Sequence, residues 1–181
     1  MRKLILVNGI PASGKSSVAK IIADHFNAPL LSIDEIKEPF MIQFAHVIDR
    51  ALNRKLGSAA YEAMFKIIAA SPENTLFVLD AWFGFKERSL LEHYLSMVDS
   101  QNTIEIWNKI SVENVVRRYQ SRCGDRIKGH PGEEYIPELK NLAMTAAPMA
   151  LSDVYIVDQN NPVDYSDINS WVSDRLNKIE S

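Results

Sequence analysis

Gly9-Ile10-Pro11-Ala12-Ser13-Gly14-Lys15-Ser16 is the stretch that decides the fold, because it matches the pattern G-x-x-x-x-G-K-[ST]. An apolar run at residues 4–7 precedes it, and an amphipathic segment begins at Lys15. A strand before this pattern and a helix after it are the context in which it forms a phosphate-binding loop. The backbone N–H groups of such a loop, with the N-terminus of the helix, bind phosphate oxygens. The sequence therefore predicts a nucleoside triphosphate site.

The positions of this loop have separate chemical tasks. Gly9 and Gly14 allow backbone angles and a close approach that a Cβ atom would prevent. We expect Lys15 to neutralise charge on the β- and γ-phosphates, and Ser16 to place its hydroxyl on Mg²⁺. The residues predicted to hold ATP are Gly9, Pro11, Ala12, Ser13, Gly14, Lys15, Ser16 and Ser17.

Beyond the loop, short apolar runs alternate with longer segments of helical periodicity. The runs occupy residues 4–7, 29–33, 76–79, 104–107 and 154–157. Most of the strong ones are continuous, which is typical of strands covered on both faces. Residues 35–70 are predicted to be entirely helical, and residues 123–137, with several Gly and Pro, to form a loop or flap. Residues 1–181 are therefore predicted to form one α/β domain around a mainly parallel sheet.

Composition limits the possible partners. The 181 residues carry a net charge of −3 and a single cysteine, Cys123, which cannot form an intramolecular disulfide. This favours a reducing, cytoplasmic location. No apolar stretch approaches the length of about 18 residues that a membrane span needs. The acidic balance disfavours nucleic acid as a partner, and we expect a monomer or a homodimer that does not bind membranes.

The sequence lacks the accessory motifs of a GTPase. Residues 108–111 read Asn-Lys-Ile-Ser where guanine-binding proteins carry Asn-Lys-x-Asp, and residues 80–83 lack the glycine of a switch motif. A small phosphotransferase is the main remaining hypothesis, because the phosphate-binding loop alone does not name a reaction. Two alternatives stay open. One is a nucleotide-binding regulatory ATPase with little turnover, and the other is a kinase of nucleoside monophosphates or of nucleic-acid 5′ ends.

Four motifs together resemble a known group of kinases. They are the loop at residues 9–16, Ser32-Ile33-Asp34-Glu35-Ile36, Leu79-Asp80-Ala81 with Arg88 behind it, and the arginine-bearing helix at residues 112–122. In this combination the chain resembles the zeta-toxin-like and chloramphenicol phosphotransferase-like P-loop kinases, from residue 1 to about residue 178. The resemblance implies a five-stranded parallel sheet in the order 2-3-1-4-5, helices on both faces, an arginine-bearing lid and the use of ATP.

Two aspartates follow predicted strands, Asp34 after residues 29–33 and Asp80 after residues 76–79. The carboxyl ends of parallel strands face the crevice where ligands bind. We expect Asp34 to accept the proton of the acceptor hydroxyl and Asp80 to organise Mg²⁺; the resemblance implies the same positions. The two could exchange these roles, and each could instead cap the following helix.

Arginines gather in the segment that begins on the helix at residues 112–122. Arg118 and Arg122 are four positions apart and share one helix face, and Arg126 follows them. Planar guanidinium groups suit a transferring phosphoryl group, whose charge spreads over three oxygens. We therefore expect residues 118–137 to form a lid, in which Arg118 and Arg122 act in catalysis and Arg126 contacts ATP.

The acceptor site is predicted to lie under the helical segment at residues 35–70. Arg50, Arg54 and Lys55 crowd within six positions of this segment, which is typical of a solvated helix face. We therefore expect ATP and a small hydroxyl compound of neutral or weak charge, such as a sugar, a nucleoside or an antibiotic.

Four further residues have two interpretations each. Trp82, Phe83 and Phe85 could line an apolar acceptor pocket or pack in the core. Arg88 could contact the acceptor or a phosphate, or it could lie on the exposed face of its helix.

Overall fold

A parallel five-stranded sheet forms the centre of the computed structural model, which describes residues 2–100 and 102–178. The strand order β2-β3-β1-β4-β5 confirms the predicted topology. The strands are β1 (Lys3–Asn8), β2 (Leu30–Ser32), β3 (Leu76–Ala81), β4 (Asn102–Lys109) and β5 (Val154–Asp158).

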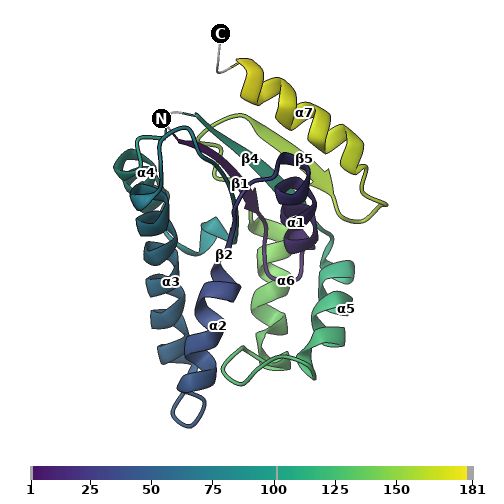
Figure 1. Ribbon diagram of the computed structural model, residues 1–181. Helices are drawn as coiled ribbons and strands as arrows, with labels where there is room; N and C mark the ends of the chain where they lie inside the picture. Colours follow the sequence, from purple (N-terminus) through teal and green to yellow (C-terminus); the bar gives the residue numbers. More distant parts are fainter. Residues whose placement is uncertain (1, 101, 179–181) are drawn as a thin grey trace.

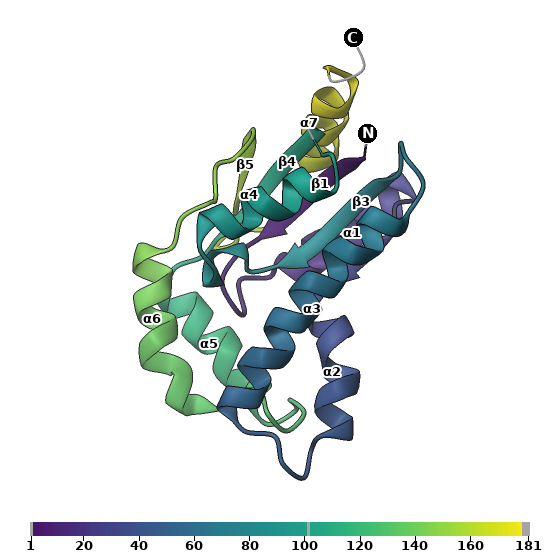
Figure 2. The ribbon, with the colours of Figure 1, turned by 90° about the vertical axis from the view of Figure 1, so that its left-hand side faces the viewer.

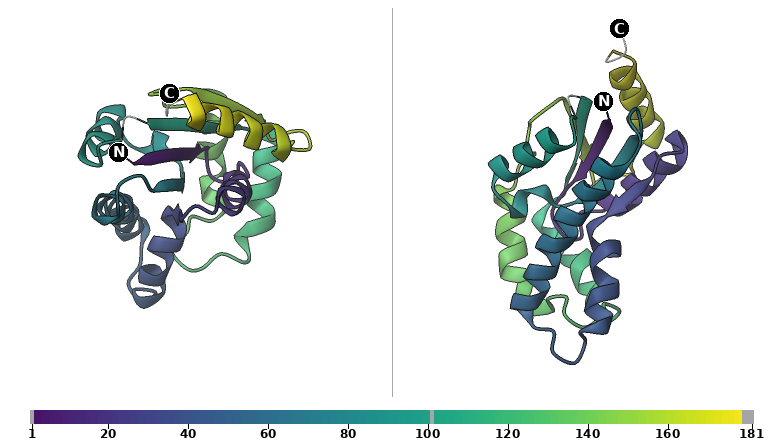
Figure 3. Two further views of the ribbon diagram at one scale, coloured as in Figure 1. Left: turned by 45° about the horizontal axis from the view of Figure 1, so that its top comes forward. Right: turned by 60° about the vertical axis from the view of Figure 1, so that its left-hand side comes forward.

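Helices cover both faces of the sheet, as predicted from its continuous apolar strands. Figures 1 and 3 show α1 (Lys15–Phe26) and α7 (Tyr165–Lys178) on one face, and α3 (Arg50–Ala70) and α4 (Arg88–Met97) on the other. Alternate residues of β1 serve the two cores: Ile5 packs on the α1 side, whereas Leu4 and Leu6 pack against α3. Because both faces of the sheet are buried, β1 does not alternate apolar and polar residues as a half-exposed strand does.

Three helices lie beyond the carboxyl ends of the strands, and the N-terminal half of α3 also extends there (Figure 2). They are α2 (Ile33–Gln43), α5 (Val112–Cys123) and α6 (Ile136–Thr145). Helices α2 and α3 confirm that residues 35–70 contain no strand. No helix within the described residues is both long enough and apolar enough to cross a lipid bilayer.

The loop predicted for residues 123–137 is wrong at its C-terminal end. A short 3₁₀ helix, η2 (Glu133–Tyr135), leads directly into α6. Pro137 belongs to the first turn of α6 and not to the loop. A proline is tolerated there because the N–H groups of the first turn have no acceptor within the helix. The irregular part is therefore residues 124–132. A second 3₁₀ helix, η1 (Phe83–Phe85), follows β3.

A buried network of polar side chains joins the strand ends. Glu105 on β4 accepts hydrogen bonds from Asn8 Nδ2 (2.7 Å) and from the backbone N–H groups of Met149 and Ala150 (2.9 Å each). Asn8 in turn accepts a hydrogen bond from the Phe83 N–H at 3.0 Å. The network thus fixes the chain that leaves β3 and the segment that leads into β5.

The same network continues toward the last strand. Asn108 donates to the Asn8 carbonyl at 3.0 Å and accepts a bond from Gln159 Nε2 at 2.8 Å. All three side chains are buried. Buried polar groups that lose their partners are costly, so the turn after β5 is held against β4 and β1.

We predict that Glu105→Ala lowers the free energy of unfolding by about 3 kcal/mol, because it leaves one buried and two partly buried donors without an acceptor. Glu105→Gln keeps one acceptor oxygen and should cost less. Urea denaturation of both variants measures the difference. Equal, small losses in the two variants would contradict a structural role for this carboxyl group.

Candidate active site

The loop at residues 9–16 joins β1 to α1 and requires both of its glycines. Gly14 has a φ of +97°, and a Cβ atom there would lie 2.5 Å from Gln159 Oε1 and 2.9 Å from Arg118 Nη1. A Cβ atom on Gly9 would lie 2.5 Å from Ser13 Oγ. The close approach that the sequence predicted at both positions is confirmed.

Two cavities meet at this loop. The main cavity, of about 590 Å³, extends between the loop, α2, α3 and residues 119–138. The second, of about 520 Å³, lies between the loop, α5 and the turn after β5. Lys15, Ser16 and Arg122 line both cavities, with Ala12. A group bound at these residues is therefore accessible from two sides.

Asp34 and Asp80 both line the main cavity, as their strand-end positions predicted. Asp80 is buried on β3; its Oδ2 accepts a bond from Ser32 Oγ (3.4 Å), and its buried Oδ1 has no hydrogen-bond partner among the described residues. Neither aspartate is a helix cap: Ser32 is the N-cap residue of α2, with Asp34 in its first turn, and Glu87 is the N-cap residue of α4. The capping interpretation is therefore wrong for both Asp34 and Asp80.

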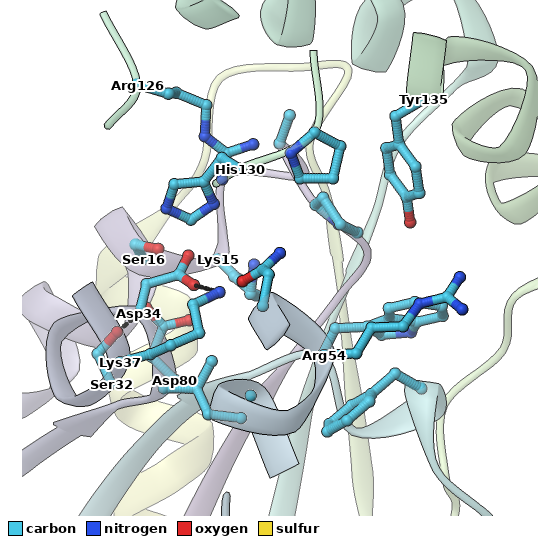
Figure 4. A pocket seen from close by; sticks show the side chains of 18 of the residues that line it. Lys15, Ser16, Ser32, Asp34, Lys37, Arg54, Asp80, Arg126, His130 and Tyr135 are labelled. Atoms are coloured by element: carbon cyan, nitrogen blue, oxygen red, sulfur yellow. Dashed lines mark hydrogen bonds and ion pairs between the residues drawn. The ribbon is translucent and has the colours of Figure 1, made fainter. Parts of the chain in front are cut away.

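The charge of Asp34 is set by two lysines. Its carboxyl group lies 3.0 Å from the ammonium group of Lys37, which is itself buried (Figure 4). Burial alone would raise the pKa of Asp34, but Lys37 and Lys15 outweigh this effect and lower the pKa to about 2. Asp34 is consequently ionised at neutral pH, so its oxygens can accept a hydrogen bond from a ligand hydroxyl.

The three predicted arginines occupy different places. Arg118 lines only the second cavity, where its guanidinium donates to the Ser13 carbonyl (3.1 Å) and to the Gln159 carbonyl (2.8 Å). Arg122 lines both cavities, and Arg126 lines the main one, 5.6 Å from the centre of the Tyr119 ring. Arg118 thus ties the phosphate-binding loop to the turn after β5, whereas the other two face the space beside Lys15.

Residues 124–132 close one side of the main cavity by docking on α2. His130 Nε2 lies 2.8 Å from Glu38 Oε1, and a Cβ atom on Gly129 would come within 2.6 Å of Ile48. Burial lowers the pKa of His130, and Arg126 and Lys37 lower it further. The imidazole is therefore neutral at pH 7 and donates to the Glu38 carboxylate. Nothing in the sequence pattern indicated this contact.

Arg50, Arg54 and Lys55 are exposed, as a solvated helix face predicts, but the first two also face the main cavity. Both line the main cavity, with Asn53, Gly57 and Ser58. The C-terminal half of α3 buries Tyr61, Met64, Phe65 and Ile68 in the core. Continuing that stripe toward the N-terminus at steps of three and four residues reaches positions 57, 54 and 50. This periodicity is the signal that sequence reasoning missed.

The aromatic residues after Asp80 divide between core and cavity. Phe83 is fully buried and packs against Tyr61, whereas Trp82 and Phe85 line the main cavity. Tyr135, which no sequence feature singled out, also lines it.

Arg88 lies on an exposed face and not at the cavity. It pairs with Glu92 at 3.1 Å and donates to the Met149 carbonyl at 3.1 Å. The interpretation of Arg88 as a contact to the acceptor or to a phosphate is therefore wrong.

The sheet order, the phosphate-binding loop after β1 and the cavities around it define a P-loop kinase fold. The family model described as chloramphenicol phosphotransferase-like protein matches residues 2–166, so the chain belongs to that family. Phosphoryl transfer is the type of activity that the family and the fold support. A search of curated proteins finds no matching relative.

Three solved structures share this fold at low sequence identity. A candidate kinase from Chloroflexus aurantiacus is 22% identical, with a TM-score of 0.79 over 98% of this chain and 97% of that one. A shikimate kinase from Bacteroides thetaiotaomicron is 16% identical, with a TM-score of 0.59 over 99% of each chain. A gluconokinase from Sinorhizobium meliloti is 16% identical, with a TM-score of 0.62 over 98% and 92%.

We predict that the Asp34 carboxyl group titrates with a midpoint near pH 2, well below the ordinary 3.8. Lys37→Met should raise this pKa, because the opposing effect of burial remains when the ammonium group is removed. Carboxyl ¹³C NMR titration measures both values. Lys20→Met, which removes only the surface partner of Asp24, is the control and should leave Asp34 unchanged. A wild-type midpoint near 3.8 would contradict the prediction.

Proposed function

We propose that this chain transfers the γ-phosphate of ATP to a hydroxyl group of a small molecule. The observation that carries the proposal is the meeting of two cavities at Lys15, Ser16 and Arg122. A phosphoryl group held there has a donor on one side and an acceptor on the other. That geometry suits in-line displacement, in which the attacking and leaving oxygens lie on opposite sides of phosphorus.

The second cavity is assigned to the nucleotide. Gly14, Ser16 and Ser17 line it at the N-terminus of α1, where backbone N–H groups and the helix dipole favour phosphate. Arg118 and Gln159 line it beside Gly14. Because Arg118 is already bonded to the Ser13 carbonyl, its role here is to hold the loop in shape beside the nucleotide.

The residues present fit a Mg²⁺ ion. Asp80 offers a buried oxygen that has no partner among the described residues, and Ser16 offers an exposed hydroxyl in both cavities. Oxygen ligands from one or two side chains, completed by phosphates and water, are typical for this ion. A bound Mg²⁺ would neutralise phosphate charge at this position.

Asp34 is assigned as the base that accepts the proton of the acceptor hydroxyl. As that proton leaves, the hydroxyl oxygen forms a bond to the γ-phosphorus, the bond from phosphorus to the β–γ bridging oxygen breaks, and ADP departs. Lys15, Arg122 and Arg126 supply positive charge around the oxygens of the transferring group. Residues 124–132 cover the site and exclude water, which would compete with the acceptor.

We predict that a screen of hydroxyl compounds with ATP and Mg²⁺ yields a phosphorylated product, measured by mass spectrometry together with ADP release. Lys15→Ala should lower turnover at least about 100-fold by removing charge stabilisation at the phosphates, while the melting temperature stays near that of the wild type. Lys20→Ala, on the exposed face of α1, is the matched control.

Two results would contradict this assignment. Near-normal turnover in Lys15→Ala would show that the loop does not act in the reaction. Slow ATP hydrolysis with no phosphorylated product would favour a regulatory ATPase instead.

We further predict that Gly57 leaves room for the acceptor. It lies inside α3 at the wall of the main cavity, and a Cβ atom there would meet no atom within 4 Å. Gly57→Ala should stabilise the protein by about 0.5–1 kcal/mol through helix propensity and preserve turnover. Gly57→Phe should lower kcat/KM for the acceptor at least about tenfold without changing nucleotide affinity. Unaltered acceptor kinetics in Gly57→Phe would place the acceptor elsewhere.

A further inference from the structure

Arg54 is a cation at the wall of the main cavity. Within residues 2–100 and 102–178, its guanidinium group has no hydrogen bond or ion pair. Its neighbours differ in this respect. Arg50 pairs with Glu138 at 2.6 Å, and Lys37 pairs with Asp34 at 3.0 Å. The charge of Arg54 is therefore available to a ligand.

Arg54 also lies away from the phosphate-binding loop. It lines the main cavity but not the second one, in contrast to Lys15 and Arg122. Figure 4 shows the Arg54 and Tyr135 side chains pointing into the same space, on the side of the cavity opposite Asp34 and Lys37. A ligand group bound to Arg54 is thus separated from the place where phosphoryl transfer is proposed.

The surroundings of Arg54 suit a group with a negative charge. Seven lysine and arginine side chains line the main cavity, against three carboxyl groups. Burial raises the pKa of Tyr135 to about 12, so its hydroxyl remains a hydrogen-bond donor at neutral pH. Trp82 and Phe85 add apolar walls, and an ion pair strengthens where water is displaced by such walls.

We propose that the acceptor carries an anionic group, a carboxylate or a phosphate, that binds to Arg54 and Tyr135 while its hydroxyl lies beside Asp34. A planar guanidinium pairs with either anion through two parallel N–H···O bonds, which fixes orientation as well as position. This assignment deepens the proposed phosphotransferase function and rests on it for the place of the reacting hydroxyl. It replaces the neutral acceptor that the sequence suggested.

The test measures binding and not turnover. ¹⁵N-labelled protein, saturated with a non-hydrolysable ATP analogue and Mg²⁺, is titrated with benzoate, phenyl phosphate and the neutral benzamide, and the Arg54 Nε–H signal is followed by NMR. We expect saturable shifts with at least one anion and at least about tenfold weaker binding of benzamide. The anion that binds more tightly identifies the class of the acceptor group.

Substitutions show whether Arg54 itself is responsible. Arg54→Gln should weaken binding of the preferred anion at least about tenfold, followed in this variant through the Trp82 indole N–H signal. Arg54→Lys should retain part of it, because the charge remains without the planar geometry. Arg117→Gln is the matched control, since Arg117 is exposed on α5, bonded to Asn114 and outside the main cavity.

Equal binding of benzamide and the anions, the absence of any saturable shift, or full anion affinity in Arg54→Gln would each overturn the proposal. Its failure is distinguishable from failure of the proposed function. Loss of anion binding leaves phosphoryl transfer to a neutral hydroxyl compound intact, whereas the absence of any phosphorylated product leaves the measured anion site in place.

Discussion

The hydrogen bonds among Asn8, Asn108 and Gln159 are the constraint on which the rest of the site depends. These amides are buried at the carboxyl ends of the strands, where each unsatisfied group would cost about 1–3 kcal/mol. Because Gln159 is fixed in this way, it can hold Arg118, and Arg118 can hold the Ser13 carbonyl. The shape of a loop near the N-terminus therefore depends on a turn that is some 150 residues away in the sequence.

This chain of contacts also explains why the loop needs glycine. Gly14 is close to both Gln159 and Arg118, and a side chain there would push against two groups that are already bonded. The positive φ of Gly14 and the crowding around it therefore both favour glycine at this position. A local sequence motif and a long-range polar network together set a single backbone geometry.

The elements that could be predicted from the sequence are those that local patterns determine. The loop motif, five apolar runs and two helical segments predicted the sheet and the places of Asp34 and Asp80. The strand order came from the family resemblance. Which way a cation faces could not be predicted in this manner. Arg54 and Lys55 are adjacent and equally polar, but only Arg54 lines the cavity, because the packing of Tyr61 and Phe65 fixes the rotation of α3.

The two sides of the site differ in how firmly they are held. The nucleotide side is bonded to the sheet by buried amides and by Arg118. The acceptor side is closed by an exposed ion pair, Arg50 with Glu138, and by the hydrogen bond from the buried side chain of His130 to Glu38. An exposed ion pair contributes only about 0–1 kcal/mol, and residues 124–132 form no regular helix or strand, so the acceptor side is held less firmly than the nucleotide side. A phosphotransferase needs this asymmetry, because the nucleotide must be held in one geometry while the acceptor enters and its product leaves.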